Sequence, residues 1–558
     1  DHYEAFFTEG RFEVRRRDQG FETHLEVVVS PEDDIELRRL RIVNVTGRRR
    51  TIEVTTYAEV VLAPAVADDM HPAFSNLFVQ TEILGESHAL LCTRRPRSAG
   101  ERPPTLVHLL AVHGASAGEP SFETDRARFI GRGGTTAAPL AMRQAGPLSG
   151  TTGSVLDPVI AIRRRIVLEP EQGVTIDAVT GISETRAGAI ALASKYRDRR
   201  LADRVFDLAW THGQVVLRQL EVNAADTQLF SRLASHVIFA NRALRADEKV
   251  MLSNRRGQSG LWGYSISGDL PIVLLRIQDS DNVELLREVV QAHAYWRNKG
   301  LAVDLVIWNE DRAGYRQRLN DQILGLIAAG GEPHSLDRPG GIFVRPGEQI
   351  AEEDRVLMQA VARVVLLDRN GTLAEQLARR GAGELRLPPP LVPVVEAGGW
   401  LPAVLGGAAA PAGGTAPVRD LVLRNANGGF TRDGREYVVT LAAGQSTPAP
   451  WSNVIANPQL GTVISESGSA YTWSENAHEY RLTPWSNDPV GDAGAEVVYL
   501  RDEDSGRVWT PTALPIRGTE PCVARHGFGY SVFERRCDGI RCELWIYVAI
   551  DAPVKFSV

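Results

Sequence analysis

Apolar and polar positions alternate with a period of two over much of the first 190 residues. Phe21, Leu25 and Val27 occupy one set of alternating positions, and Glu22, His24 and Glu26 occupy the other. A turn-rich stretch at 30–34 follows, and alternation resumes over 35–45 and 52–56. Short alternating runs separated by turns are typical of a β-sandwich or barrel. The pattern predicts a partial β-sandwich over residues 1–186.

The period changes to that of a helix after residue 186. Leu201, Val205, Leu208 and Ala209 recur at spacings of three and four, which places them on one face of a helix. A further helix is expected near 226–239. We therefore interpret residues 187–267 as a helical connector.

Strands and helices alternate over residues 268–380. Buried-type strands are expected at 270–277, 302–308, 341–344 and 363–367. Helices are expected at 281–296, at about 312–329, from 352, and up to about 380. Asp281 is a helix-capping residue and Gly300 a helix-terminating one. Four successive βα units predict a parallel, doubly wound α/β module.

Residues 381–417 are rich in Pro, Gly and Ala and poor in charge, which is typical of a linker. Residues 418–558 return to β-type alternation and are expected to form the N-terminal part of a second β-sandwich. The predicted fold class is thus multidomain, with β-sandwich domains flanking a helical connector and an α/β parallel-sheet module.

Residues 8–39 align without gaps on 527–558, at an offset of 519 (527 minus 8). Each copy reads as a strand, a turn (18–20 or 537–539), a second strand and the start of a third. The identities are Gly10/Gly529, Arg16/Arg535, Arg17/Arg536, Gly20/Gly539, Leu25/Leu544 and Val29/Val548. We infer an excerpt from a longer tandem protein, in which each copy opens or closes a sandwich at the same point. Alternatively, the two halves complete each other, within one chain or between two copies by swapping.

Composition narrows the classes of partner and cofactor. The chain has 62 basic and 69 acidic residues, a net charge of −7, and 43% hydrophobic residues. Arginine runs at 48–50 and 163–165 lack an aromatic platform, so we expect no nucleic acid partner. No apolar run reaches the roughly 18 residues of a membrane span. The 4 cysteines fit neither a disulfide framework nor a zinc site, and we predict no metal and no cofactor.

Aromatic and hydroxyl-binding side chains are densest near the C-terminus. Planar rings stack on sugar rings, while Arg, Asn and Asp bind hydroxyl groups by paired hydrogen bonds. An alternative is that the tryptophans are sandwich core and that 487–489 is a plain turn. The candidate sugar-binding residues are Trp473, Arg481, Trp485, Asn487, Asp488 and Arg501.

Several of these segments resemble a known family. Residues 471–473, 481–489 and 499–502 are similar to the N-terminal β-sandwich of the cellobiose-phosphorylase family (glycoside hydrolase family 94), as are 427–437 and 450–458. Residues 21–29, 57–64 and 257–271 resemble the cyclic β-1,2-glucan synthase subgroup. The resemblance covers nearly the whole chain.

The resemblance implies a very large bacterial inner-membrane enzyme that builds β-1,2-glucan from UDP-glucose and trims it with a phosphorylase-like part. This chain would lie between two catalytic barrels, on the cytoplasmic side, and would itself be soluble. Its partners would be β-1,2-glucan or a related oligosaccharide and those barrels, with a homodimer as a further option. In the family, the sandwich helps to shape the sugar site, which by motif match falls on the loop holding Arg481, Trp485, Asn487 and Asp488.

The departures from the family concern catalysis. Residues 259–264 resemble a sugar-binding barrel segment, but Ser265 and Ile266 stand where the family has an Arg-Asp pair. No convincing general acid with a phosphate site is found, so we predict no catalytic residue. Trp262, Tyr264 and Asp269 form a second candidate platform, with interface packing as the alternative.

The leading hypothesis is therefore a non-catalytic carbohydrate-binding and scaffolding region. The alternatives are an independently active glycan phosphorylase or glycosidase, and a purely structural spacer.

Overall fold

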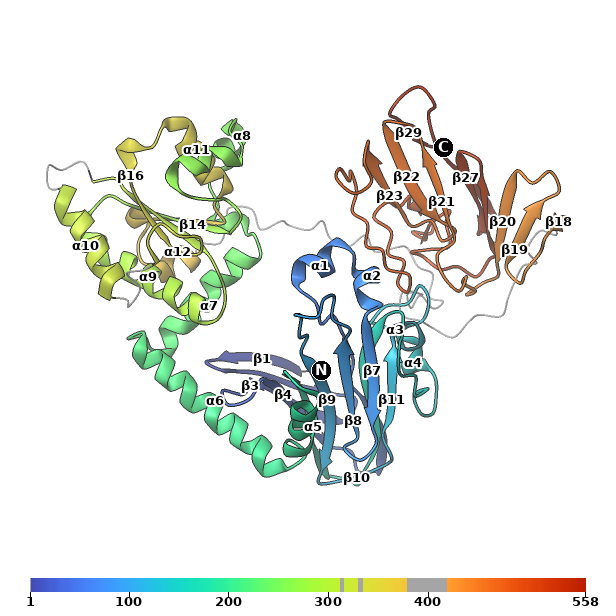
Figure 1. Ribbon diagram of the computed structural model, residues 1–558, viewed down its shortest axis with the longest axis horizontal. Coiled ribbons are helices and arrows are strands. Elements are labelled where there is room, and N and C mark those ends of the chain that lie inside the picture. The colour runs from blue at the N-terminus through green and yellow to red at the C-terminus, as the bar shows by residue number, and fades with distance from the viewer. Residues whose placement is uncertain (1, 312–315, 330–334, 379–418) are drawn as a thin grey trace. The chain divides into compact units, whose positions relative to one another are not determined.

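The structure is a computed structural model in which the chain forms two compact units, and each is described by itself (Figure 1). It describes residues 2–311, 316–329, 335–378 and 419–558. The first unit comprises 1–16, 24–32 and 203–389, and the second comprises 17–23, 33–202 and 390–558. The predicted linker at 381–417 lies outside the described residues. The predicted domain boundaries stay predictions.

The second unit contains the predicted N-terminal sandwich. Its larger layer has the antiparallel order β4-β13-β9-β8-β7, and the facing layer is built on β12, with β10, β11, β5 and β6. Ile42, Leu90 and Ile176 of the first layer join Ile160 and Ile162 of the second in one buried cluster. The alternation read from sequence therefore produces two packed layers, each with one apolar face. The bounds are β4 Ile35–Asn44, β5 Arg50–Thr55, β6 Ala58–Glu59, β7 Val79–Leu84, β8 Ala89–Arg94, β9 Thr105–His113, β10 Ser116–Ala117, β11 Ser121–Asp125, β12 Pro158–Leu168 and β13 Gly173–Ser183.

Short helices occupy the connections of this sandwich. They are α1 Ala65–Met70, α2 Pro72–Asn76, α3 Arg126–Ile130, α4 Leu140–Arg143 and α5 Arg186–Lys195. The Asp125 side chain accepts a hydrogen bond from the backbone N–H of Ala127 and so caps α3. This cap starts the segment that contacts the C-terminal sandwich.

The C-terminal sandwich also lies in the second unit. A seven-stranded sheet, β18-β19-β20-β26-β27-β28-β29, faces a three-stranded layer, β21-β22-β23. Phe533 and Ile546 of the sheet pack with Ile455 and Ile464 of the layer. The bounds are β18 Leu421–Val422, β19 Gly428–Thr431, β20 Glu436–Leu441, β21 Ser452–Ala456, β22 Leu460–Ser465, β23 Ala470–Ser474, β24 Leu500–Arg501, β25 Val508–Trp509, β26 Cys522–Gly527, β27 Tyr530–Cys537, β28 Ile540–Val548 and β29 Lys555–Ser557.

The two copies of the sequence repeat form matching hairpins. The first copy gives β2 (Arg11–Asp18) and β3 (Phe21–Val29), after β1 (His2–Thr8), and the second copy gives β27 and β28. Each has a two-residue turn whose residues both have positive φ: 51° and 82° at Gln19-Gly20, and 48° and 82° at Asp538-Gly539. Two positive φ angles suit the right-handed twist of a hairpin, and glycine at the second position adopts one without strain.

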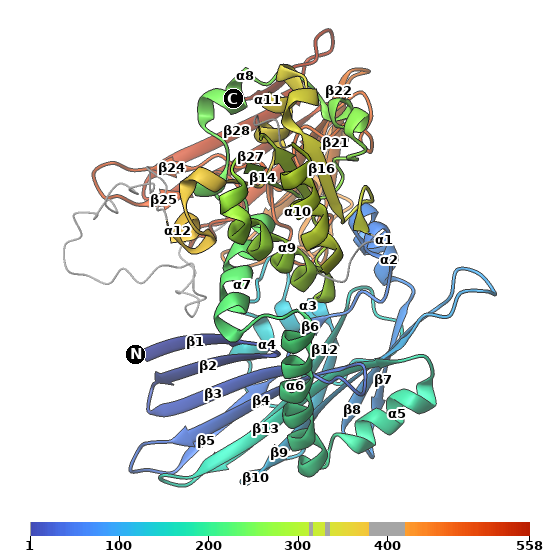
Figure 2. The ribbon, with the colours of Figure 1, turned by 90° about the vertical axis from the view of Figure 1, so that its left-hand side faces the viewer.

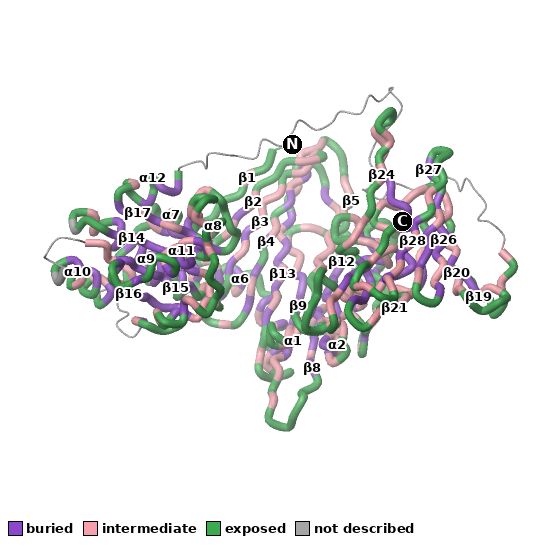
Figure 3. Tube along the Cα trace, turned by 90° about the horizontal axis from the view of Figure 1, so that it is seen from above, coloured by how far each residue is buried: buried purple, intermediate pink, exposed green. Residues whose placement is uncertain are grey.

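The first unit contains the predicted parallel sheet. Its order, β16-β15-β14-β17, places the first strand of the module between the second and the fourth, which is a doubly wound topology. Apolar clusters cover both faces, one with α9 and α10 and the other with α11. The strands are accordingly buried (Figure 3). The bounds are β14 Ile272–Ile277, α9 Val283–Asn298, β15 Asp304–Asn309, α10 Arg316–Ala329, β16 Ile342–Pro346, α11 Glu352–Val361, β17 Val364–Leu367 and α12 Leu373–Ala378.

One of the two predicted helix-end signals in this module is confirmed. The predicted cap at Asp281 is wrong: the Asp279 side chain accepts a hydrogen bond from the Asp281 amide, and the residue before α9 is Asn282, whose side chain makes no capping bond. The predicted stop is confirmed, since α9 ends before Gly300, whose φ is 80°. The predicted start of the next helix at 312 and the end of the last near 380 lie outside the described residues.

Three further helices precede the parallel sheet: α6 Arg199–Gln219, α7 Ala224–Ile238 and α8 Glu248–Ser253. Asn223 and Asp226 form a reciprocal capping box at the start of α7. β1, β2 and β3 run side by side (Figure 2), and β1 and most of β2 and β3 belong to the first unit. Among the described residues, no helix combines the length and the apolar character that crossing a membrane requires.

Candidate functional site

A pocket of about 200 Å³ lies in the second unit at the loop that follows β23. One wall comes from that loop, and the other comes from α1 and the start of α2. The pocket therefore joins two segments about 400 residues apart in sequence. Its lining residues are Asp68, Asp69, Met70, Pro72, Arg481, Trp485, Ser486 and Asn487.

Trp485 provides the aromatic surface of this pocket. Its ring stacks on the buried Tyr471, with centroids 5.0 Å apart and planes 13° from parallel. The Arg481 guanidinium carbon is 5.8 Å from the Trp485 ring centroid. The Trp485 residue is still 40% exposed. Trp485 is thus held from behind by Tyr471 and remains accessible in front.

The opposite wall carries two adjacent carboxylates. Asp68 and Asp69 belong to the short helix α1, between Pro64 and Pro72. His71, at the junction of α1 and α2, lies 6.4 Å from Trp485, ring centroid to centroid, with an edge-on geometry. Sequence reasoning missed this wall, because nothing in the local pattern of 65–72 shows which distant loop it faces.

A half-buried carboxylate fixes the base of the loop. Glu496 accepts hydrogen bonds of 2.6 Å from the hydroxyls of Thr472 and Thr483, and it pairs with Lys555. Burial would raise the pKa of Glu496, but Lys555 and the two hydroxyls outweigh burial and lower it. Glu496 therefore stays charged and ties together the two ends of the segment that precedes Trp485.

Asp488 lies beside the pocket and is bound by an arginine. Its two oxygens accept hydrogen bonds of 2.7 and 3.0 Å from Arg126, which also contacts Asp157 at 3.0 Å and Glu59 at 2.9 Å. Burial would raise the pKa of Asp488, but Arg126 and the amides of residues 490–491 hold the pKa of that carboxyl below its usual range. Because both oxygens are bound, Asp488 positions the loop, and we leave it out of the proposed sugar contacts.

A second arginine makes a parallel contact. Arg132 donates to Asp492 at 2.8 Å and to the buried Glu466 at 3.0 Å. Between the two arginines, Phe129 and Ile130 pack with Val490 in an apolar cluster. We call Arg126 and Arg132, with their carboxylate partners, the arginine clamp. The clamp joins the two sandwiches of the second unit at the residues that follow the pocket loop.

Two other candidate residues, Trp473 and Arg501, do not line the pocket. Trp473 is half-buried, and its ring lies where a side chain at Gly461 would stand, 2.1 Å from an added Cβ. Its ring centroid is 5.4 Å from that of Tyr471. Arg501, on β24, is exposed and lies 3.7 Å from Glu503.

The second candidate platform lies in the first unit. Trp262 is 63% exposed, and its indole N–H donates to the Ser267 carbonyl at 3.3 Å. The Tyr264 hydroxyl donates to Asp354 at 3.0 Å, and Asp269 accepts from the Gln258 amide at 3.0 Å. Gln258 also donates to the Ser267 carbonyl, so Trp262 and Asp269 belong to one local hydrogen-bond network, whereas Tyr264 bonds to Asp354 on α11. The polar atoms of this candidate platform are thus already bound within the fold.

A cavity of about 240 Å³ beside α4 is lined in part by the buried Glu123 and Arg163. Glu123 accepts from the amides of Thr124 and Asp125, each at 2.9 Å. Arg163 donates to the carbonyls of Ala141 and Gly146. Glu123 also accepts a hydrogen bond from the Ser149 hydroxyl. Both charged groups thus hold the 141–149 segment in place, so we assign this cavity a structural role.

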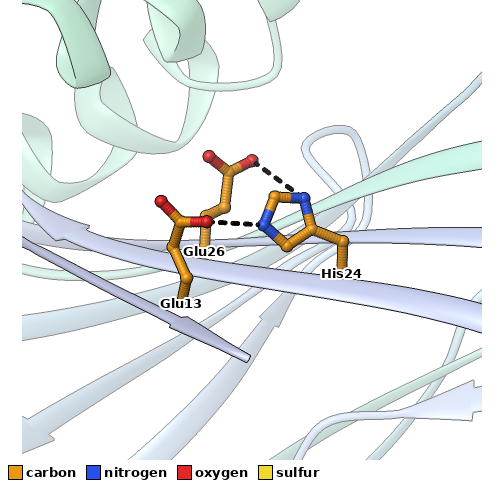
Figure 4. Close-up of side chains that lie close together, drawn as sticks. All are labelled: Glu13, His24 and Glu26. Atoms are coloured by element: carbon orange, nitrogen blue, oxygen red, sulfur yellow. Dashed lines mark hydrogen bonds and ion pairs between the residues drawn. The ribbon is translucent and has the colours of Figure 1, made fainter. Parts of the chain in front are cut away.

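Glu13, His24 and Glu26 form a cluster on β2 and β3 that sequence reasoning missed (Figure 4). His24 Nε2 is 2.9 Å from Glu13, and Nδ1 is 3.9 Å from Glu26. Arg11 contacts both carboxylates, and Arg15 lies 3.6 Å from Glu13. The two arginines balance the two carboxylates, so we interpret the cluster as an ion-pair network rather than a metal centre.

Comparison with known proteins places the chain in a family. The glycosyl hydrolase 94 supersandwich domain matches residues 1–199 and 435–558. The cyclic β-(1,2)-glucan synthase NdvB of Rhizobium meliloti is 35% identical over 561 residues, which cover 96% of this chain and 19% of that relative.

Two phosphorylases match a smaller part. The N,N'-diacetylchitobiose phosphorylase of Vibrio proteolyticus is 32% identical over 22% of this chain and 15% of its own length. The solabiose phosphorylase of Paenibacillus borealis is 29% identical over 23% of this chain and 17% of its own length. The chain spans less than a fifth of each of these relatives. From the extent of the domain match, this chain belongs to the glycosyl hydrolase 94 supersandwich family.

Proposed function

We propose that the second unit binds an oligosaccharide, β-1,2-glucan or a close relative, in the pocket built on Trp485, without cleaving it. The observation that carries the proposal is the exposed indole, which is backed by Tyr471 and lies beside charged and amide side chains. Such a ring packs against the C–H face of a sugar. Asp68, Asp69 and Asn487 supply hydroxyl-binding groups around it.

The proposal of β-1,2-glucan comes from the similarity to a cyclic β-(1,2)-glucan synthase. In a protein of that kind, this chain would hold the glucan and position neighbouring catalytic barrels on the cytoplasmic side of the inner membrane. The arginine clamp supports a positioning role, because it ties the pocket loop to a second sandwich through partly buried ion pairs.

Binding without catalysis fits the placement of the acids in this pocket. Glycoside cleavage uses two carboxyl groups on opposite sides of the scissile bond. Asp68 and Asp69 are adjacent on one six-residue helix, so a bound sugar would meet both from the same side. An active phosphorylase would release glucose 1-phosphate from β-1,2-glucan and phosphate, and that product in a reaction with the purified chain would overturn this part of the proposal.

Calorimetric titration of the full chain with linear β-1,2-glucan tests binding. We expect saturable heat, and a loss of affinity of about tenfold or more for Trp485→Ala, since stacking and apolar contact at one aromatic ring are worth roughly 1.5–3 kcal/mol. Trp210→Ala is the matched control, because Trp210 lies on α6 and is 66% exposed. An absence of heat, or equal losses for the two variants, would favour a structural spacer.

A further inference from the structure

The repeated strands differ in how far they are buried. At the offset of 519, residues 3–8 of β1 correspond to β26, and β2 and β3 correspond to β27 and β28. β26 is buried or half-buried along its whole length, whereas β1 is exposed at all but one of its positions (Figure 3). Homologous strands therefore have different surroundings.

The difference is greatest on one face of the sheet. We call the set listed below the Tyr3 face. None of its residues is buried, and Tyr3, Phe7 and Val29 are 66, 69 and 65% exposed. The Phe7 and Phe12 rings lie 4.7 Å apart, which confirms that β1 and β2 share this face. The Tyr3 face consists of Tyr3, Ala5, Phe7, Phe12, Val14, Leu25, Val27 and Val29.

The corresponding face of the C-terminal sheet is core. Cys522, Ala524, Phe533, Leu544, Ile546 and Val548 occupy the positions equivalent to Tyr3, Ala5, Val14, Leu25, Val27 and Val29, and all of them are buried. The layer β21-β22-β23 covers them, through Ile455, Leu460, Ile464 and Ala470. Asn453 on β21 fastens this layer by donating to the carbonyls of Gly527 and Tyr530.

The opposite face of β1–β3 is partly closed within the first unit. Glu13, Glu26 and Val28 project there and are 5, 7 and 2% exposed. The Tyr3 face thus carries the apolar residues of the alternating pattern and is exposed, whereas side chains on the opposite face of the same strands are buried. An exposed apolar patch of this kind marks an interaction site.

We propose that the Tyr3 face is a docking surface for a three-stranded antiparallel β-layer with the apolar pattern of β21–β23. The repeat identifies this occupant, because its second copy shows which layer packs on the same strands. Sheets pack face to face through alternating apolar side chains at about 10 Å, which fits this face. The NdvB relative is about five times as long as the match, so polypeptide that could supply such a layer exists in proteins of this kind.

A fusion protein tests the proposal without requiring a free fragment to bind. Residues 419–521 are placed directly ahead of Tyr3 in the full chain, the position that the offset assigns to them (522 minus 519). We expect hydrogen exchange in β1–β3 to slow by about tenfold or more relative to the unfused chain. Unchanged exchange in β26–β28 of the same sample shows that the protein is folded.

Two controls decide whether the Tyr3 face is responsible. Phe7→Asp should abolish the added protection, whereas Phe6→Asp, on the other face of the same strand, should retain it. A fused segment carrying Ile455→Asp and Ile464→Asp should protect nothing. The proposal is overturned if β1–β3 exchange is the same with and without the segment, or if both Phe variants behave alike. It is also overturned if the unfused chain forms a dimer that Phe7→Asp dissociates in analytical ultracentrifugation, since the occupant would then be a second copy.

Discussion

The loop with Trp485 and the segment with Trp262 were both predicted from sequence as aromatic sugar platforms, and they differ in the structure. Trp485 stacks on Tyr471, lines a pocket and precedes carboxylates bound by half-buried arginines. Trp262 is more exposed, and its polar atom is bound by the Ser267 carbonyl within the same turn. An exposed indole therefore indicates a binding surface only where other elements pack against one face of the ring and place polar groups beside the other face.

The largest expected difference between the two regions is the loss of stability when an arginine is removed from each. Arg126→Met leaves Asp488 and Asp157 without their cation, so we expect a loss of about 3–5 kcal/mol in the opening free energy of the clamp. Arg256→Met, six residues before Trp262, removes an exposed contact with Glu353 and a longer one, of 3.5 Å, with Asp354, and should cost about 1 kcal/mol. Hydrogen exchange of residues 121–130 and 488–492, against 256–269, measures both. Similar losses of stability for the two variants would show that the ion pairs of the two regions do not differ as described.

Adding a methyl group beside each region should have a smaller effect. Gly461→Ala places a Cβ 2.1 Å from the Trp473 ring, so the indole must move and we expect about 1–3 kcal/mol of destabilisation. Gly263→Ala, next to Trp262, meets nothing within 4 Å and should stay within about 0.5 kcal/mol of the wild type. Urea unfolding of both variants checks this. An unshifted midpoint for Gly461→Ala would show that Trp473 is not held as described.

Acidification should weaken the clamp in a defined direction. The folded-state pKa of Asp488 lies below its unfolded value of about 3.9, so its contribution is present above that pH and is lost as the pH falls through the folded pKa. We expect clamp stability to fall below about pH 4, with a shallower fall in Asp488→Asn, whose group cannot titrate there. Urea midpoints between about pH 3 and 7 measure the slope. If stability fell equally with pH in the wild type and in Asp488→Asn, the Asp488 carboxylate would not contribute to the stability of the clamp.

The smallest expected effect is on ligand binding. Trp262→Ala should change the affinity for linear β-1,2-glucan by less than about twofold, because its surroundings do not form a ligand surface. Calorimetry on this variant completes the comparison with Trp485. A loss as large as that of Trp485→Ala would show that the first unit binds glucan as well.

Local periodicity was enough to predict much of the fold. The parallel strands, the stop at Gly300 and the two matched hairpin turns depend on residues close together in sequence, and the structure has all three. The position of Asp488 could not be predicted in the same way. Its Asn-Asp-Pro context is typical of hydroxyl binding or a turn, and its partner Arg126 is 362 residues away.

The pocket shows the same limit. Arg481, Trp485 and Asn487 were expected together because they are neighbours in sequence, and all three line the pocket. Asp68 and Asp69 belong to a short helix with no recognisable binding pattern. Their place opposite Trp485 is set by the packing of two sandwiches, which no alternation or spacing encodes.

The arginine clamp begins at the residue that follows Asn487, so the pocket and the junction between sandwiches share one stretch of backbone. Thermodynamic linkage makes such coupling reciprocal: a sugar that immobilises 481–487 must make the junction harder to open, by the same free energy with which a closed junction improves sugar affinity. Under the proposed glycan binding, an occupied pocket would therefore stabilise the junction between the two sandwiches, and loss of the sugar would loosen it.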